Sequence, residues 1–196
     1  MAVILITSTA KAQTTPNSVG YQVFYALKSS TSYNEFAKYF VTANDCRTLA
    51  LQATNSAAHN ELNDLADALE QGEVIENRVY RVYSIVKGAK QQLNIDWSKI
   101  EYVDWFYKTK GKMGINGCVG TLIFKYKGKH FIVSPVVYNV NNIYKLAHWG
   151  NSFEKILMTV LSENLNTTYQ NGQYCLSDGA QSECMNIAQE LNEMNF

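Results

Sequence analysis

Residues 119–149 have the sequence VGTLIFKYKGKHFIVSPVVYNVNNIYKLAHW, and this stretch decides the fold class. β-Branched and aromatic residues fill it, and the breaks at Lys127-Gly128 and Asn139–Asn142 have the composition of turns. The pattern predicts antiparallel strands joined by short turns, over residues 119–126, 130–138 and 143–149. Pro135 interrupts the second strand and indicates a bulge or an edge position, because proline has no N–H to donate to a neighbour.

A fourth strand is predicted just upstream. From Trp97 to Lys108 the chain alternates loosely, and β-branched and aromatic residues again dominate. Residues 110–117 contain three glycines and are predicted to form a loop. The four strands make a meander whose apolar face needs a cover.

Helical periodicity predicts the elements that supply this cover. Apolar residues recur three and four positions apart, which predicts helices near residues 19–29, 32–43, 62–69, 79–93, 153–165 and 184–191. The second helix begins at a capping box, in which the Ser32 hydroxyl and the Glu35 carboxylate satisfy backbone N–H groups of the first turn.

The connecting segments are predicted from their breakers. Residues 46–51 extend the second helix after a kink near Asn44-Asp45, and residues 53–60 form a linker. Gly72 is predicted to be the left-handed cap that ends the third helix. Residues 167–182 are polar and are predicted to form turns.

The elements together predict an α+β protein, with N-terminal helices packed on a curved antiparallel meander sheet and an extra C-terminal helical segment. The predicted organisation is a lead-in over residues 1–17, an α+β domain over 18–150 and a C-terminal helical extension over 151–196. With 196 residues and 46% hydrophobic content, the chain is long enough for one domain with a proper core.

The charge balance and the motifs exclude several functional classes. Lys+Arg and Asp+Glu both total 17, whereas a nucleic-acid-binding protein usually has a basic excess. No segment approaches the roughly 20 apolar residues of a membrane span. No nucleotide-binding or nucleophile-elbow motif occurs, and the three histidines lack metal-ligand spacing. We therefore expect no nucleic acid, membrane span, cofactor or metal; the partner is a small molecule or a protein, and a homodimer is compatible with these features.

The first residues suggest export. Ala2–Ile6 is an apolar run, and Ala10-Lys11-Ala12 has the small residues that a signal peptidase requires. A complete signal has a basic start and roughly 7–15 apolar residues, so this stretch is interpreted either as the remnant of a leader or as a buried strand at Val3–Ile6. The polar stretch Thr7–Asn17 favours the leader, which predicts a periplasmic or secreted protein.

The four cysteines fit an oxidising compartment. None forms a Cys-x-x-Cys motif, which argues against a zinc ribbon or a thioredoxin-type site. We expect a disulfide between Cys175 and Cys184, because the eight residues between them form a polar loop that closes easily. Cys46 and Cys118 either pair with each other or remain buried thiols.

Three segments resemble the nuclear transport factor 2-like (SnoaL-like) superfamily, in an exported form. Residues 23–40 are similar to its paired opening helices, residues 120–129 to a hairpin of its sheet, and residues 136–146 to a strand, polar turn and aromatic-Lys-Leu strand. The resemblance covers about residues 19–150. It implies a cone-shaped fold with a mouth where a ligand could enter.

The resemblance also implies candidate site residues. Family members that act as enzymes place an Asp or His in the cone, and the candidates here are Asp104, His130 and His148. Aromatic candidates for lining a ligand site are Trp105, Tyr107, Tyr138 and Trp149.

The function expected from these features is an exported, non-catalytic binding domain for a small molecule, an envelope component or a protein. Two alternatives stay open. One is an enzyme on the same fold with Asp104 or His148 as general base. The other is an immunity or inhibitor protein that neutralises a secreted partner.

Overall fold

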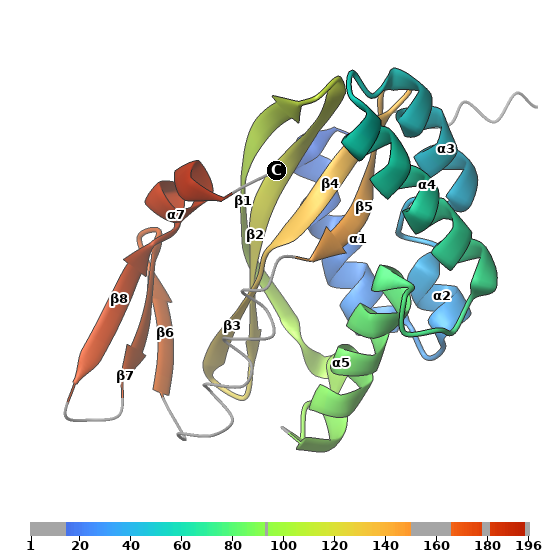
Figure 1. The fold of residues 1–196 in the computed structure, drawn as a ribbon. Helices are drawn as coiled ribbons and strands as arrows, with labels where there is room; N and C mark the ends of the chain where they lie inside the picture. The colour runs from blue at the N-terminus through green and yellow to red at the C-terminus, as the bar shows by residue number, and fades with distance from the viewer. Residues whose placement is uncertain (1–14, 93, 150–165, 178–180, 195–196) are drawn as a thin grey trace, which may run out of the picture.

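The central sheet of the protein is antiparallel (Figure 1). The computed structural model describes residues 15–92, 94–149, 166–177 and 181–194. Within these residues the strands are β1 (Glu101–Lys112), β2 (Ile115–Tyr126), β3 (Lys129–Val133), β4 (Pro135–Val140) and β5 (Ile143–Trp149). Their order is β1-β2-β4-β5, β3 also pairs with β2, and the described strands do not close into a barrel. The predicted α+β class and the antiparallel sheet are confirmed.

The first hairpin is longer than predicted. The expected loop over residues 110–117 is wrong, because β1 and β2 continue through it and pair as far as Lys112 and Ile115. The turn consists of Met113 and Gly114, with φ angles of 55° and 83°. Two consecutive positive φ angles match the twist of a two-residue hairpin, so the other two glycines of the segment lie within strands.

The interruption predicted at Pro135 is present. β3 pairs with the second half of β2, β4 pairs with its first half, and Ser134 lies between them. Pro135 is the first residue of β4 and pairs with Trp149 of β5. A proline is tolerated at this position because the first residue of a strand can lack an N–H without breaking the ladder.

Six α-helices lie within the described residues: α1 (Pro16–Ser29), α2 (Tyr33–Ala37), α3 (Ala43–Gln52), α4 (Ser56–Gln71), α5 (Arg78–Gln92) and α7 (Ile187–Glu193). The expected lead-in over residues 1–17 is wrong at its end, because Thr15 caps α1 and residues 16 and 17 are helical. The leader or strand predicted within residues 1–14 lies outside the described residues, as does the helix predicted over residues 153–165.

Capping explains where the predicted helix boundaries were wrong. The expected kink at Asn44-Asp45 is the start of a new helix, because Thr42 and Asp45 form a capping box. The linker predicted over residues 53–60 is shorter, since Asn55 caps α4 through the N–H of Ala58 and residues 56–60 are helical. Gly72 has a positive φ of 78° but a ψ of −122°, so it is not the predicted left-handed cap.

Helices cover both faces of the sheet. On one face α1 lies directly over Trp105 of β1, and a Cβ at Gly20 or Gly120 would overlap the Trp105 ring. On the other face α3 and α4 pack against Ile115 and Val140 in a second apolar cluster. Close packing on both faces explains why β2 is buried over nearly its whole length.

Over its described residues, 166–177 and 181–194, the C-terminal region is mainly a second sheet and not the predicted helical extension. It contains β6 (Asn166–Gln170), β7 (Gln173–Ser177) and β8 (Ser182–Asn186), and α7 follows directly. The predicted turns over residues 167–182 and the placement of Cys184 on a helix are therefore wrong. Polar composition concealed these strands, although Asn171-Gly172 is a strong hairpin signal and both residues have positive φ.

Candidate functional site

Two of the candidate catalytic residues meet the same tyrosine between the two sheets. The Tyr169 hydroxyl on β6 donates to Asp104 Oδ2 on β1 at 2.9 Å. The His130 ring on β3 lies 6.1 Å from the Tyr169 ring, centroid to centroid. Asp104 Oδ1 accepts the backbone N–H of Trp105 at 2.8 Å. Both carboxylate oxygens of Asp104 are therefore used within the protein.

The electrostatics of this cluster favour structural hydrogen bonding. Burial, and then the bond and charge of Asp104, raise the pKa of Tyr169 to about 12, so its hydroxyl keeps its proton. Burial lowers the pKa of His130, and its Nδ1 is buried with no hydrogen-bond partner among the described residues. The His130 carbonyl accepts from Tyr174 and Thr167 at 2.9 and 2.6 Å. The cluster joins the C-terminal sheet to the central one.

His148 lies in a different part of the molecule. It is on β5, at the opposite edge of the sheet from Asp104 on β1. Three strand spacings separate the two edges, or about 14 Å. The His148 ring contacts Tyr138 edge-on, with centroids 6.4 Å apart. Burial raises the pKa of Tyr138 to about 12. The structure therefore does not combine His148 with Asp104 in one acid–base pair.

A partly buried ion pair links α3 to β5, the edge strand that also carries His148. Lys145 Nζ on β5 lies 2.6 Å from Asp45 Oδ2. Burial opposes ionisation, but the bonds from Lys145 and Thr42 hold the pKa of Asp45 below its usual value. Because Asp45 also caps α3, this charge serves the helix start and its attachment to β5.

The three aromatic candidates whose side chains the structure describes are distributed over both faces of the sheet. Trp105 is only 7% exposed because it lies under α1, and its ring contacts Gly120. Tyr138 pairs with Gly117 of β2, which lies three residues before Gly120. Strand alternation therefore places Tyr138 on the face opposite to Trp105. Tyr107 stacks on Trp105 at the surface, whereas the Trp149 side chain lies outside what the structure describes.

Exposed tyrosines gather where α1 passes over β1. Tyr21 and Tyr25 on α1 are 54% and 50% exposed, and Tyr107 on β1 is 40% exposed. The Tyr21 ring stacks on Tyr102 of β1, with centroids 4.7 Å apart and planes 11° from parallel. We call these four residues, Tyr21, Tyr25, Tyr102 and Tyr107, the tyrosine face.

Ring packing holds the tyrosine face in place. Tyr102 also contacts Phe24 edge-on at 5.6 Å, and Phe24 contacts Tyr25 at 5.7 Å. Trp105 supports Tyr107 at 6.4 Å, and its Nε1 donates to the Pro16 carbonyl. The exposed rings are thus supported by partly or fully buried ones, which reduces the entropy lost when a ligand binds them.

The tyrosine face has little charge. The only charged residue on α1 is Lys28, whose Nζ donates to the Ile100 carbonyl at 2.9 Å and lies 5.2 Å from the Phe24 ring centroid. Apart from Lys28, the polar neighbours on α1 are uncharged: the amides of Asn17 and Gln22 and the hydroxyls of Ser18 and Ser29. Sequence reasoning assigned Tyr21 and Tyr25 only to a helix, although both lie off its apolar stripe at a spacing of four residues.

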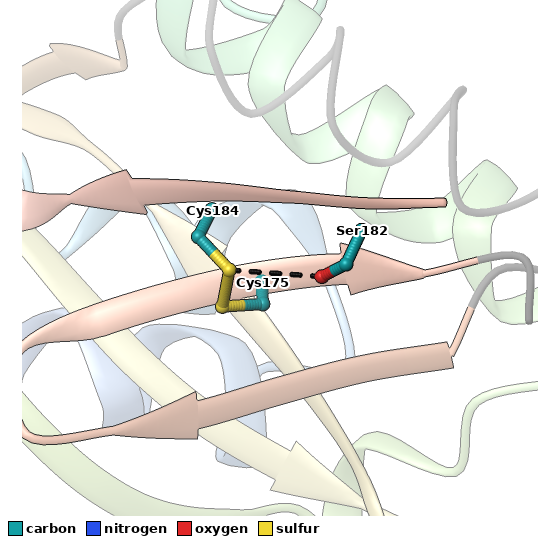
Figure 2. Close-up of a disulfide and its surroundings, with 3 residues drawn as sticks. All are labelled: Cys175, Ser182 and Cys184. Atoms are coloured by element: carbon teal, nitrogen blue, oxygen red, sulfur yellow. Dashed lines mark hydrogen bonds between the residues drawn. A yellow bond between two sulfur atoms is a disulfide. The ribbon is translucent and has the colours of Figure 1, made fainter. Parts of the chain in front are cut away.

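The cysteines divide as one disulfide and two thiols. The predicted Cys175–Cys184 disulfide is present and joins residues directly opposite each other on β7 and β8 (Figure 2). The second pairing left open, between Cys46 and Cys118, is not formed. Both thiols are buried, and burial raises the pKa of each to about 12.

Among the described residues, no three His, Cys, Asp or Glu side chains lie close enough to hold a metal. No helix in the described ranges is both long and apolar enough to cross a membrane. No protein-family model, curated protein or solved structure matches this chain. Among the described residues, the tyrosine face is the strongest candidate for a binding site.

Proposed function

We propose that this chain is an exported binding protein of the nuclear transport factor 2-like kind, and that it binds its partner through the tyrosine face without catalysing a reaction. The observation that carries this proposal is the exposure of Tyr21, Tyr25 and Tyr107, each supported by another aromatic ring. Tyrosine is enriched in binding surfaces because it offers a large, rigid contact area with a polar tip.

Other features support the proposed family and the proposed export. Helices that precede an antiparallel meander support the family, and the Cys175–Cys184 disulfide supports an oxidising compartment. The enzyme alternative is weaker, because both oxygens of Asp104 accept hydrogen bonds within the protein and His148 lies at the opposite edge of the sheet.

Titration of the ¹⁵N-labelled protein tests the binding surface. The panel consists of neutral oligosaccharides, acidic polysaccharides, small metabolites and a solubilised envelope extract. We expect amide shifts confined to α1 and β1 for at least one component, and their loss in a Tyr21→Ala, Tyr25→Ala variant. Leu51→Ala on α3 is the matched control, since Leu51 is exposed outside this face.

Two results would contradict the proposal. One is a set of shifts around Asp104, His130 and Tyr169 together with turnover of a panel component, which would favour the enzyme. The other is the absence of shifts with the whole panel. Export is tested separately, by locating the oxidised protein in the extracytoplasmic fraction of its cells.

A further inference from the structure

We infer that the tyrosine face binds a neutral, polyhydroxylated polymer, that is, an uncharged glycan. This inference rests on the proposed function and names the class of partner that the same surface would take. Three properties of the face support it: the presentation of its rings, the kind of polar groups beside them, and the lack of a free charge on α1.

The rings are presented flat. Tyr21 lies nearly parallel to Tyr102, at 4.7 Å and 11°, so one side of its ring is used and the other faces outward. Its 54% exposure fits this arrangement. An outward aromatic face is complementary to the apolar C–H face of a pyranose ring, whose hydroxyls project around its rim.

The rings are also spread along α1 and β1. Tyr21 and Tyr25 are four residues apart on α1, which separates them by about 6 Å along the helix axis. Tyr107 is five residues beyond Tyr102 on β1, at most about 17 Å along the strand, and the register shift between Tyr102 and Asp104 keeps both on one side of β1. A linear polymer could place successive rings on successive tyrosines, and weak stacking contacts would add up through multivalency.

The polar groups beside the rings suit hydroxyls. The amides of Asn17 and Gln22 each carry donors and an acceptor, as a sugar hydroxyl does. Lys28 is engaged by the Ile100 carbonyl and the Phe24 ring. Glu101 adjoins Tyr102 but points to the other side of β1 by strand alternation. An acidic glycan would find no free cation on α1 to balance its charge.

A protein partner fits this surface less well. Protein interfaces are also rich in tyrosine, but their core is fully desolvated, and charged groups fix the register of the partners. The exposed aliphatic residues Leu51 and Ile75 lie on α3 and after α4, and neither belongs to α1 or β1. The tyrosine face instead combines separate rings with amides, which suits a hydrated ligand.

Isothermal titration with four neutral hexasaccharides tests the inference: cellohexaose, chitohexaose, maltohexaose and mannohexaose. Polygalacturonate is the charged comparison. We expect at least one neutral hexasaccharide to bind with a Kd below about 1 mM, and polygalacturonate to bind more weakly. Tyr21→Ala should weaken binding about tenfold, whereas Tyr21→Phe, which keeps the ring, should change it less than about threefold. Ile75→Ala should leave the Kd unchanged.

Thermal unfolding of each variant confirms that it is folded before its affinity is measured. The inference is overturned if no neutral hexasaccharide binds, if Tyr21→Ala and Tyr25→Ala both leave the Kd unchanged, or if polygalacturonate binds more tightly. If a different component of the NMR panel shifts α1 and β1, only the glycan class fails. If nothing shifts these elements, the proposed function fails with it.

Discussion

The helix-and-sheet region over residues 15–149 and the C-terminal region over residues 166–194 are stabilised in different ways. The first contains two apolar clusters and nearly all of the buried hydrophobic side chains. The second adds three buried hydrophobic residues to the core, Tyr174, Ile187 and Leu191, and carries the disulfide. Within the described residues, the second region therefore has fewer buried apolar side chains than the first, and a covalent link and polar contacts add to them.

The contacts between the two regions combine apolar packing with hydrogen bonds. Tyr169 binds Asp104, and Lys108 Nζ donates to Asn192 Oδ1 at 2.6 Å. Lys110 donates to the Met194 carbonyl, close to the C-terminal end of α7 where a cation also suits the helix dipole. Local opening requires the least free energy where few apolar contacts are lost. We therefore expect the C-terminal region to open before the central sheet.

Truncation of the core should produce the largest effect. Phe36 on α2 is fully buried and contacts Phe40 and Tyr83 at 5.0 and 5.7 Å. Phe36→Ala should lower the free energy of unfolding by about 3–5 kcal/mol, because it removes buried surface and leaves a cavity. Denaturant titration should show this loss, and hydrogen exchange should accelerate in both regions.

A conservative variant keeps this test informative if Phe36→Ala does not fold. Phe36→Leu preserves most of the volume and should cost less than about 1.5 kcal/mol. If β6–β8 kept their protection while the central sheet exchanged, the C-terminal region would be an independent folding unit, and the comparison would fail.

Removal of the disulfide should have the next largest effect and should act locally. Cys175 and Cys184 are nine positions apart, and closing so short a loop stabilises by roughly 2–3 kcal/mol. In the Cys175→Ser, Cys184→Ser variant, hydrogen exchange should accelerate in β7, β8 and α7 but not in β2. Reduction of the wild-type protein with dithiothreitol should reproduce this pattern. A uniform acceleration over the whole chain would show that the two regions unfold as one.

The same contrast explains how much of the fold could be predicted. Residues 119–149 are apolar and β-branched, so their strands were predicted with nearly correct bounds. β6–β8 are polar, and composition alone suggested turns. A two-residue hairpin turn depends on the backbone torsion angles of its two residues. Composition does not show these angles, so the turn at Met113-Gly114 could not be distinguished from a longer glycine-rich loop.

The candidate site was predicted less well, because it depends on contacts between distant segments. Asp104 and His130 were identified as residue types, but the partner that they share, Tyr169, is 65 residues from Asp104. Tyr21 belongs to the tyrosine face because it stacks on Tyr102. Periodicity identifies the apolar stripe of a helix, and it does not show what a residue outside that stripe touches.

Removing one hydroxyl should weaken the junction between the regions moderately. Tyr169→Phe deprives Asp104 Oδ2 of its donor and should cost about 1–2 kcal/mol, since the bond is to a carboxylate. Because its pKa is raised to about 12, Tyr169 keeps its proton in the folded protein up to about pH 12, whereas the unfolded chain releases it near the ordinary tyrosine pKa of 10.0. The free energy of unfolding of the wild type therefore falls as the pH rises from about 10 to about 12, and that of Tyr169→Phe should fall less.

Measurement of unfolding from pH 8 to pH 11 compares the two proteins. Burial also raises the pKa of Tyr102 and Tyr138, so only the difference between wild type and variant reports on Tyr169. Tyr25→Phe at an exposed position is the control. An equal loss in the control and in Tyr169→Phe would show that the bond to Asp104 does not stabilise the junction.

The smallest expected effect is a gain in stability when Glu190 on α7 is replaced by Gln. Oε2 of Glu190 is buried with no hydrogen-bond partner among the described residues. Burial, and then the charge of Glu193, raise the pKa of Glu190 above its ordinary 4.5. A raised carboxyl pKa means that the folded state binds the proton more tightly, so stability falls as pH rises from 4.5 and the ionised group is unfavourable at pH 7.

Glu190→Gln should therefore raise the Tm at pH 7 by about 1–3 °C, and the gain should vanish below about pH 4.5, where the carboxyl is protonated in both states. Glu193→Gln, at the exposed end of the same helix, should have a smaller effect. Glu190 also lies in the first turn of α7, where the helix dipole favours a negative charge. The upward pKa shift indicates that burial outweighs this attraction. A lower Tm in Glu190→Gln would reverse that order and would mean that the C-terminal region depends on this charge.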